Sequence, residues 1–110
     1  MQPRTLIRNN RITVFLSGDI DHHTARRYRE YTDALIQEKK PSCLALDFSG
    51  VSFMDSSGIG LIMGRYRMML LYGGKVRVVG VPAQLKKMME LSGIGGLDVF
   101  EGREISDENN

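Results

Sequence analysis

Apolar and polar positions change over short distances at the start of the chain, which predicts an opening β-hairpin. Residues 5–8 and 12–16 are β-prone runs, and Asn9-Asn10-Arg11 lies between them. Asparagine tolerates the positive φ that tight hairpin turns require. We expect the second run to end at residues 18–21, where a glycine and two aspartates interrupt the β-prone pattern.

The stretch from about residue 22 to residue 38 has the spacing of an amphipathic helix. Its apolar positions recur at three- and four-residue intervals, and most charged residues lie outside them. The shared face consists of Ala25, Tyr28, Tyr31, Thr32 and Leu35. Lys39-Lys40-Pro41 ends the helix, because cations suit its C-terminus and proline cannot continue it.

An apolar run over residues 43–48 predicts a central, buried strand, and a short loop connects it to a second helix. This helix begins near Ser56 or Ser57 and ends near Gly73. Its predicted inward face contains Ile59, Ile62, Met63, Tyr66, Met69 and Leu70. Leu61, Met68 and Tyr72 recur on the other side, which is either covered by another helix or part of an interaction surface.

The rest of the pattern completes an α/β domain. Residues 75–79 predict a strand, and Pro82 suits the first turn of a third helix with an apolar side of Leu85, Met88, Met89 and Leu91. A short last strand covers residues 97–100. Strands that alternate with helices imply crossover connections. We therefore expect one domain over residues 1–100, with a mixed, mostly parallel sheet of four to five strands, opened by a hairpin and covered by three to four helices.

Composition narrows the class of protein. The 110 residues suffice for one core, and no apolar run approaches the roughly 20 residues that cross a bilayer. The net charge of +2 is too small to indicate a nucleic-acid partner. We expect a soluble, cytoplasmic monomer with a reduced, buried Cys43. Residues 101–110 carry four acidic side chains and one arginine, so we expect them to form a flexible tail.

The adjacent serines at the start of the second helix are the leading candidate site. A helix N-terminus presents unpaired N–H groups and partial positive charge, which favour a cap oxygen or an anion. Spacing alone leaves two roles open: either serine is the N-cap, or Ser56 accepts a phosphate. A phosphate would place a charge of about −1.5 to −2 beside Asp55 and would repel or reorient a docked partner.

Catalytic, metal and nucleotide sites receive less support. The glycines of residues 58–64 are spaced one residue too far for a dinucleotide loop and are better explained by a tight loop and close helix packing. His22 and His23 have no further histidine to complete a metal site. A triad of Ser56, His23 and Asp21 lacks the Gly-x-Ser-x-Gly turn of hydrolases. We expect no cofactor and no enzymatic activity.

Two of these stretches are expected to meet in the fold. Asp21-His22-His23 and Asp55-Ser56 both stand where the carboxyl end of a strand meets a helix, and such ends share one edge of a parallel sheet. Asp21 and Thr24 either cap the first helix or contact a partner.

Three stretches in this order resemble the anti-sigma-factor antagonists of the STAS-domain family, in particular the sporulation group that acts on sigma-F. They are residues 53–66, with Asp55-Ser56-Ser57-Gly58 at their centre, residues 18–25, and residues 91–94. The resemblance covers the chain from about the first strand to Phe100.

The resemblance implies a switch that is controlled by phosphorylation. The unphosphorylated protein would bind an anti-sigma-factor serine kinase and free the sigma factor. The kinase would phosphorylate Ser56, the serine directly after the aspartate, and a serine phosphatase would reset the switch. The implied partner-binding residues are Asp21, His22, His23, Thr24, Asp55, Ser57, Gly58, Leu61 and Arg65. The alternative is an STAS domain that binds a nucleotide and has no role with a sigma factor.

Overall fold

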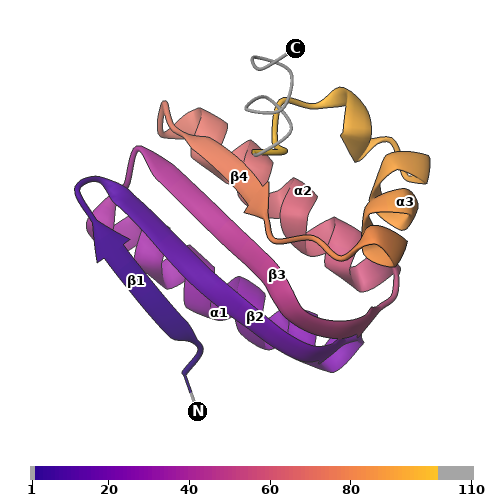
Figure 1. Cartoon of the computed structure of the whole chain (residues 1–110). Coiled ribbons are helices and arrows are strands. Elements are labelled where there is room, and N and C mark those ends of the chain that lie inside the picture. The colour runs from indigo at the N-terminus through magenta and orange to yellow at the C-terminus, as the bar shows by residue number, and fades with distance from the viewer. Residues whose placement is uncertain (1, 102–110) are drawn as a thin grey trace.

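The strands and helices of the protein follow the predicted alternation (Figure 1). The structure is a computed structural model, and it describes residues 2–101. In chain order the elements are β1 (Arg4–Arg8), β2 (Arg11–Ile20), α1 (His22–Lys39), β3 (Cys43–Met54), α2 (Ser56–Leu71), β4 (Lys75–Val79), α3 (Ala83–Leu91) and a short 3-10 helix, η1 (Ile94–Gly96).

The four strands form one mixed sheet in the order β1-β2-β3-β4. β1 runs antiparallel to β2, whereas β2, β3 and β4 are mutually parallel. Asn9 has a φ of 57° in the turn between β1 and β2, as the sequence predicted for a hairpin asparagine. The predicted mixed, mostly parallel sheet opened by a hairpin is confirmed.

Helices α1 and α2 lie together behind one face of this sheet (Figure 1). Alternation along β2 directs Ile12, Val14 and Leu16 into the core between sheet and helices, where each is at most 1% exposed. β3 and β4 are buried more continuously, as expected for central parallel strands covered by helices. Cys43 lies in β3 as a free, buried thiol, and burial raises its pKa.

β2 and β3 continue beyond their predicted ends. The glycine-containing stretches at residues 18–21 and 49–50 do not end the strands, because β2 and β3 remain paired through them. The pairing shifts its register there, between Phe15 and Ser17 and again between Gly18 and Asp19. Gly18 adopts a φ of +73°, which a β-bulge accommodates. The two strands therefore extend side by side to Ile20 and Met54.

The last predicted strand, at residues 97–100, does not form. η1 leaves only a short segment beside β4, where a single parallel bridge joins Val78 to Phe100 and the Val78 N–H donates to the Val99 carbonyl at 2.7 Å. The predicted apolar side of α3 is also corrected at Leu91, which is 81% exposed, while Leu85 and Met89 are buried.

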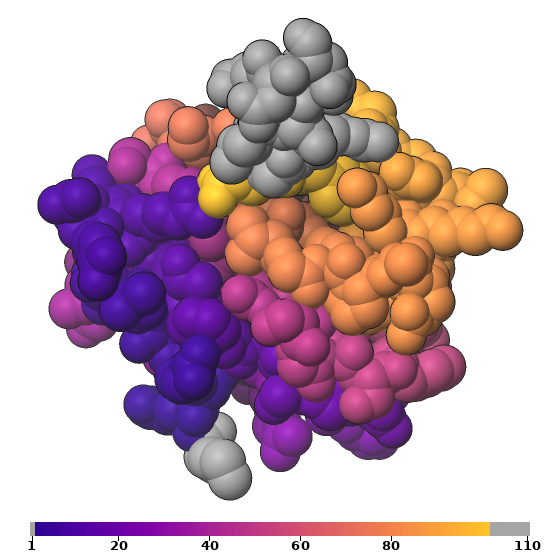
Figure 2. All heavy atoms as spheres, viewed as in Figure 1, coloured from indigo at the N-terminus to yellow at the C-terminus, as the bar shows by residue number. Residues whose placement is uncertain are grey.

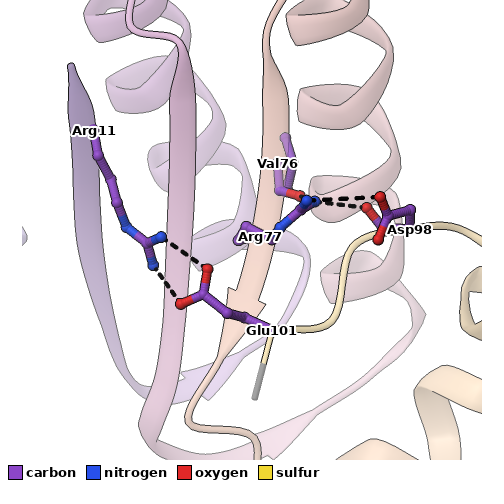
Figure 3. Close-up of polar contacts among 5 residues, drawn as sticks. All are labelled: Arg11, Val76, Arg77, Asp98 and Glu101. Atoms are coloured by element: carbon purple, nitrogen blue, oxygen red, sulfur yellow. Dashed lines mark hydrogen bonds and ion pairs between the residues drawn. The ribbon is translucent and has the colours of Figure 1, made fainter. Parts of the chain in front are cut away.

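Two arginines of the sheet form hydrogen bonds with the end of the described chain (Figure 3). Arg11 in β2 donates two hydrogen bonds to the Glu101 carboxylate, at 2.8 and 2.9 Å. Arg77 in β4 donates to the Asp98 carbonyl at 2.7 Å. Glu101, which we placed in the tail, thus contacts the domain, and residues 102–110 lie outside the described residues.

Figure 2 shows the surface of the molecule from the same side as Figure 1. The β1–β2 hairpin, in indigo, occupies the left side of the view, and α3, in orange, occupies the right. Within residues 2–101, no helix has both the length and the apolar character that crossing a membrane would require.

Candidate functional site

The carboxyl ends of β2 and β3 bring the two predicted stretches together. Ile20 and Met54 are paired residues at the ends of these strands, and the Asp55 N–H donates to the Ile20 carbonyl at 3.1 Å. This bond joins the first residue after β3 to the last residue of β2. The loop that starts α1 and the loop that starts α2 are therefore neighbours at one edge of the sheet, as the topology predicted.

Asp55 is the N-cap of α2. Its backbone is extended, with φ −99° and ψ −170°, and its carboxylate accepts the Ser57 N–H at 2.8 Å. A carboxylate suits this place because it satisfies an unpaired N–H group and interacts favourably with the helix dipole. The hypothesis that Ser56 or Ser57 caps the helix is wrong, since the preceding aspartate already fills that role.

Ser56 is the first residue of α2 and its side chain is exposed, whereas Ser57 is half-buried. Neither hydroxyl makes a hydrogen bond to another of the described residues. The Ser56 hydroxyl therefore stands free at a helix N-terminus, where the dipole favours a negative group. Of the two serines, Ser56 is the more accessible to an enzyme that transfers phosphate.

A capping box builds the neighbouring start of α1. The Asp21 carboxylate accepts the N–H groups of His23 and Thr24 at 2.9 and 3.0 Å, and the Thr24 hydroxyl accepts the Asp21 N–H at 2.9 Å. These hydrogen bonds, led by that from Thr24, lower the pKa of the Asp21 carboxyl. The capping role of Asp21 and Thr24 is thus confirmed, and the charge of Asp21 is held beside the α2 start.

His22 and His23 are exposed on the first turn of α1, with ring centroids 5.7 Å apart in an edge-to-face arrangement. Within residues 2–101, no cluster of three or more histidine, cysteine or acidic residues is arranged to hold a metal ion. The two imidazoles remain surface groups next to the Asp21 cap.

Three of the predicted partner-binding residues, Gly58, Leu61 and Arg65, are buried. Leu61 is 3% exposed and Arg65 is 5% exposed. Arg65 reaches from α2 to α1, where Nη2 lies 3.0 Å from Asp33 Oδ1, and burial lowers the pKa of its guanidinium. Gly58, Leu61 and Arg65 are therefore not part of the exposed surface at this edge. The side of α2 at Leu61 is covered by packing within the domain, and Arg65 joins the two helices.

The buried face of α2 is turned relative to the prediction. Its buried residues are Gly58, Leu61, Ile62, Arg65 and Met69, while Leu70 is 55% exposed. A Cβ added at Gly58 would overlap the Met54 side chain, whereas Cβ atoms at Gly60 and Gly64 would meet only open space. Close packing thus explains Gly58 alone, and all three glycines lie within the helix instead of forming a loop around a phosphate.

Phe53 is a surface feature that the sequence analysis missed as a site residue. It pairs with Asp19 at the end of the β2–β3 extension and is 55% exposed, two residues before Asp55. The sequence predicts a loop at this position, and a loop has no alternating pattern that would indicate which way the Phe53 side chain points. An exposed aromatic ring beside two capped helix starts adds apolar area to the edge that carries Ser56.

The sheet order, the two crossover helices, and the Asp55 cap beside the exposed Ser56 together describe an STAS-type domain. The family model for the STAS domain matches residues 2–103, and the chain belongs to this family.

Two relatives narrow the comparison within this family. An anti-sigma F factor antagonist of Paenibacillus polymyxa is 36% identical over 83 residues, which are 76% of this chain and 71% of that protein. An anti-sigma-B factor antagonist of Listeria monocytogenes is 28% identical over 99 residues, or 90% of this chain and 84% of that protein.

A solved structure supports the fold independently. The anti-sigma factor antagonist SpoIIAA in its unphosphorylated form has a TM-score of 0.79 and 24% identity, and the match covers 97% of this chain and 94% of that one. SpoIIAA in its phosphorylated form matches with a TM-score of 0.71. The architecture described above is therefore the fold that SpoIIAA has.

Proposed function

We propose that this protein is an anti-sigma-factor antagonist that works as a phosphorylation-controlled partner switch. In its unphosphorylated form it binds an anti-sigma-factor serine kinase, and this binding frees a sporulation sigma factor. The kinase uses ATP to phosphorylate Ser56, which ends the complex, and a serine phosphatase restores the active form. The protein acts as a substrate and regulator, not as an enzyme, and the switch operates in the cytoplasm.

The observation that carries this proposal is the division of roles between Asp55 and Ser56. Asp55 caps α2, so the Ser56 hydroxyl is not needed for capping and is exposed at the helix start. Phosphorylation can therefore change the surface without removing a contact that holds the helix. The phosphate would also be favoured by the N-terminal dipole of α2.

Charge explains how the modification would end the complex. Two carboxylates already lie at this edge: Asp55 caps α2 directly before Ser56, and Asp21 caps the neighbouring start of α1. A phosphate adds about −1.5 to −2 to this edge. A partner whose surface fits the unmodified edge then meets both added bulk and added negative charge.

The contact surface in this proposal includes Asp21, His22, His23 and Thr24 at the start of α1 with Asp55 and Ser57 at the start of α2. The first set adjoins the second through the bond between the Asp55 N–H and the Ile20 carbonyl. Phe53 extends the same surface. Gly58, Leu61 and Arg65 are buried and lie beneath this surface, within the domain.

The first test is site-mapped mass spectrometry after incubation with a cognate anti-sigma kinase and ATP. We expect one added phosphate, on Ser56. Ser56→Ala should accept none and Ser57→Ala should accept one, so the pair separates the two adjacent hydroxyls. Phosphate on Ser57, or no phosphate with a kinase that is active and bound, would contradict the proposal.

Binding to the kinase tests the consequence of the modification. We expect Ser56→Ala to bind like the unmodified protein and to resist release by ATP, whereas Ser56→Asp binds weakly. Isothermal titration calorimetry gives both affinities. Tight binding by Ser56→Asp would count against charge as the cause of release.

A further inference from the structure

A second feature lies away from the Ser56 edge, where the start of β1 approaches α1. Here the structure contains a cavity of about 620 Å³, within the range of about 300–1,000 Å³ that is usual for sites that bind small molecules. Four segments line it. They contribute Gln2 to Arg4 at the chain start, Phe15 to Ser17 of β2, Thr24, Arg27, Tyr28 and Tyr31 of α1, and Ser49 and Gly50 of β3.

Three of the twelve residues that line this cavity are aromatic. Tyr28 and Tyr31 line it from α1, whereas alternation along β2 turns the Phe15 ring to the opposite face of the sheet, under the Arg4 guanidinium. Both tyrosine hydroxyls are already bonded: Tyr31 to the Thr5 hydroxyl at 2.7 Å, and Tyr28 to the Ser17 N–H at 3.1 Å. These bonds hold the rings in place, so the cavity is shaped before any ligand enters.

The cavity is also positively charged. Arg4 and Arg27 line it, and none of the described residues that line it is acidic. The Arg4 guanidinium lies over the Phe15 ring, 4.0 Å from its centroid, and has no ion pair with the described residues. Arg27 likewise has no ion-pair partner among them. Two arginines without counter-ions beside aromatic walls are suited to a ligand with an anionic group and a flat, apolar body.

We propose that this cavity binds an aromatic carboxylate, with its ring against Tyr28 and Tyr31 and its carboxylate attracted by the charges of Arg4 and Arg27. The site goes beyond the proposed switch and does not depend on it, because Ser56 is not part of the cavity. Its occupant would touch Thr24, whose hydroxyl belongs to the Asp21 capping box. A bound ligand would therefore contact the capping box that forms the start of α1, next to the Ser56 edge.

The experiment uses the full chain and 2-naphthoate as the probe, followed by two-dimensional amide NMR. We expect saturable shifts at Arg4, Ser17, Thr24 and Arg27. The neutral 2-naphthamide, which has the same ring system, should bind about ten-fold more weakly, because it cannot form charge-assisted hydrogen bonds with the arginines. Shifts confined to other residues, or equal affinity for the amide, would overturn the proposal.

Matched variants identify the charges that matter. Arg27→Gln and Arg4→Gln should each weaken binding of 2-naphthoate about ten-fold. Arg26→Gln on α1 and Arg8→Gln on β1 change neighbouring arginines outside the cavity and should leave the affinity unchanged. Equal losses in both pairs would show a nonspecific charge effect and overturn the site. Ser56→Ala should bind the probe normally, so failure of the switch and failure of this site remain distinguishable.

Discussion

At the scale of single residues, the start of α2 separates the group that holds the helix from the group that can be modified. Asp55 satisfies the Ser57 N–H, and the hydroxyl of Ser56 next to it bonds to none of the described residues. Two adjacent polar side chains therefore have opposite energetic roles. Their substitution should affect stability to clearly different extents.

Asp55→Ala should lower the free energy of unfolding by about 0.5–2 kcal/mol, because it removes the side-chain cap of α2. Asp55→Asn keeps an oxygen that can accept the Ser57 N–H and serves as the matched control, with a smaller loss. Urea unfolding followed by circular dichroism measures both values. An unchanged stability in Asp55→Ala would show that the cap seen here does not stabilise the helix.

Ser56→Ala should change the free energy of unfolding by less than about 0.5 kcal/mol, as is usual for exposed side chains without a special contact. The same urea series gives this value beside that of Asp55→Ala. A loss as large as that of Asp55→Ala would assign a capping role to the Ser56 hydroxyl after all. It would also mean that phosphorylation disturbs the helix itself.

At the scale of elements, the glycines of α2 differ although they share one motif. Gly58 faces Met54 at the end of β3, where an added Cβ would overlap the methionine side chain. Gly60 faces open space on an exposed part of the helix. Only the first of them is required by the packing of helix against strand.

Gly58→Ala should therefore destabilise the protein by about 1–3 kcal/mol through overpacking against Met54. Gly60→Ala, two residues along the same helix, should stabilise it by about 0.5–1 kcal/mol, because alanine loses less backbone entropy than glycine. Thermal unfolding of the two variants makes the comparison. Equal effects would indicate that Met54 moves aside freely.

At the scale of the whole molecule, the last described residue is joined to the second strand. The Arg11 guanidinium, mainly through its hydrogen bonds, holds the pKa of the Glu101 carboxyl below its ordinary value of 4.5. A depressed pKa stabilises the fold above that ordinary value, and the contribution is lost as pH falls through the folded-state pKa. About a third of each side chain is exposed, at 37% for Arg11 and 33% for Glu101, so solvent screens the pair.

Glu101→Gln should thus lower stability at pH 7 by only about 0.2–1 kcal/mol. The difference from the unmodified protein should shrink as pH falls below 4.5 and should vanish as pH falls through the lowered folded-state pKa of Glu101. Glu38→Gln, which neutralises an exposed carboxylate on α1, is the control and should show no such trend. Melting curves across this pH range test the pair, and a difference that grows on acidification would contradict it.

The sequence predicted the order of elements well because each one has a strong local pattern. Apolar alternation in residues 12–16, the continuous apolar run from Cys43 and the helical spacing around Ile62 all depend on neighbours in the chain. It failed where distant pairing overrides a local signal. Gly18 and Gly50 are turn signals by themselves, yet pairing between β2 and β3 carries both strands past them with bulges.

The site shows the same division. Periodicity placed a helix start at the two serines, and topology placed Asp21 near Asp55. It could not assign the cap to Asp55, nor show that α1 covers the side of α2 that holds Leu61 and Arg65. Both facts depend on the orientation of one element against another, which no periodic pattern contains.

The sequence by itself determined the three helices, the first four strands and their order, the mixed parallel sheet and the serine-bearing helix start, because spacing and turn residues act over a few positions of the chain. Tertiary structure alone decided which faces are buried, which of two serines stands free, and that an aromatic, arginine-lined cavity forms between β1 and α1. These outcomes arise from packing between segments that are far apart in sequence, where exposure and charge are set by three-dimensional neighbours.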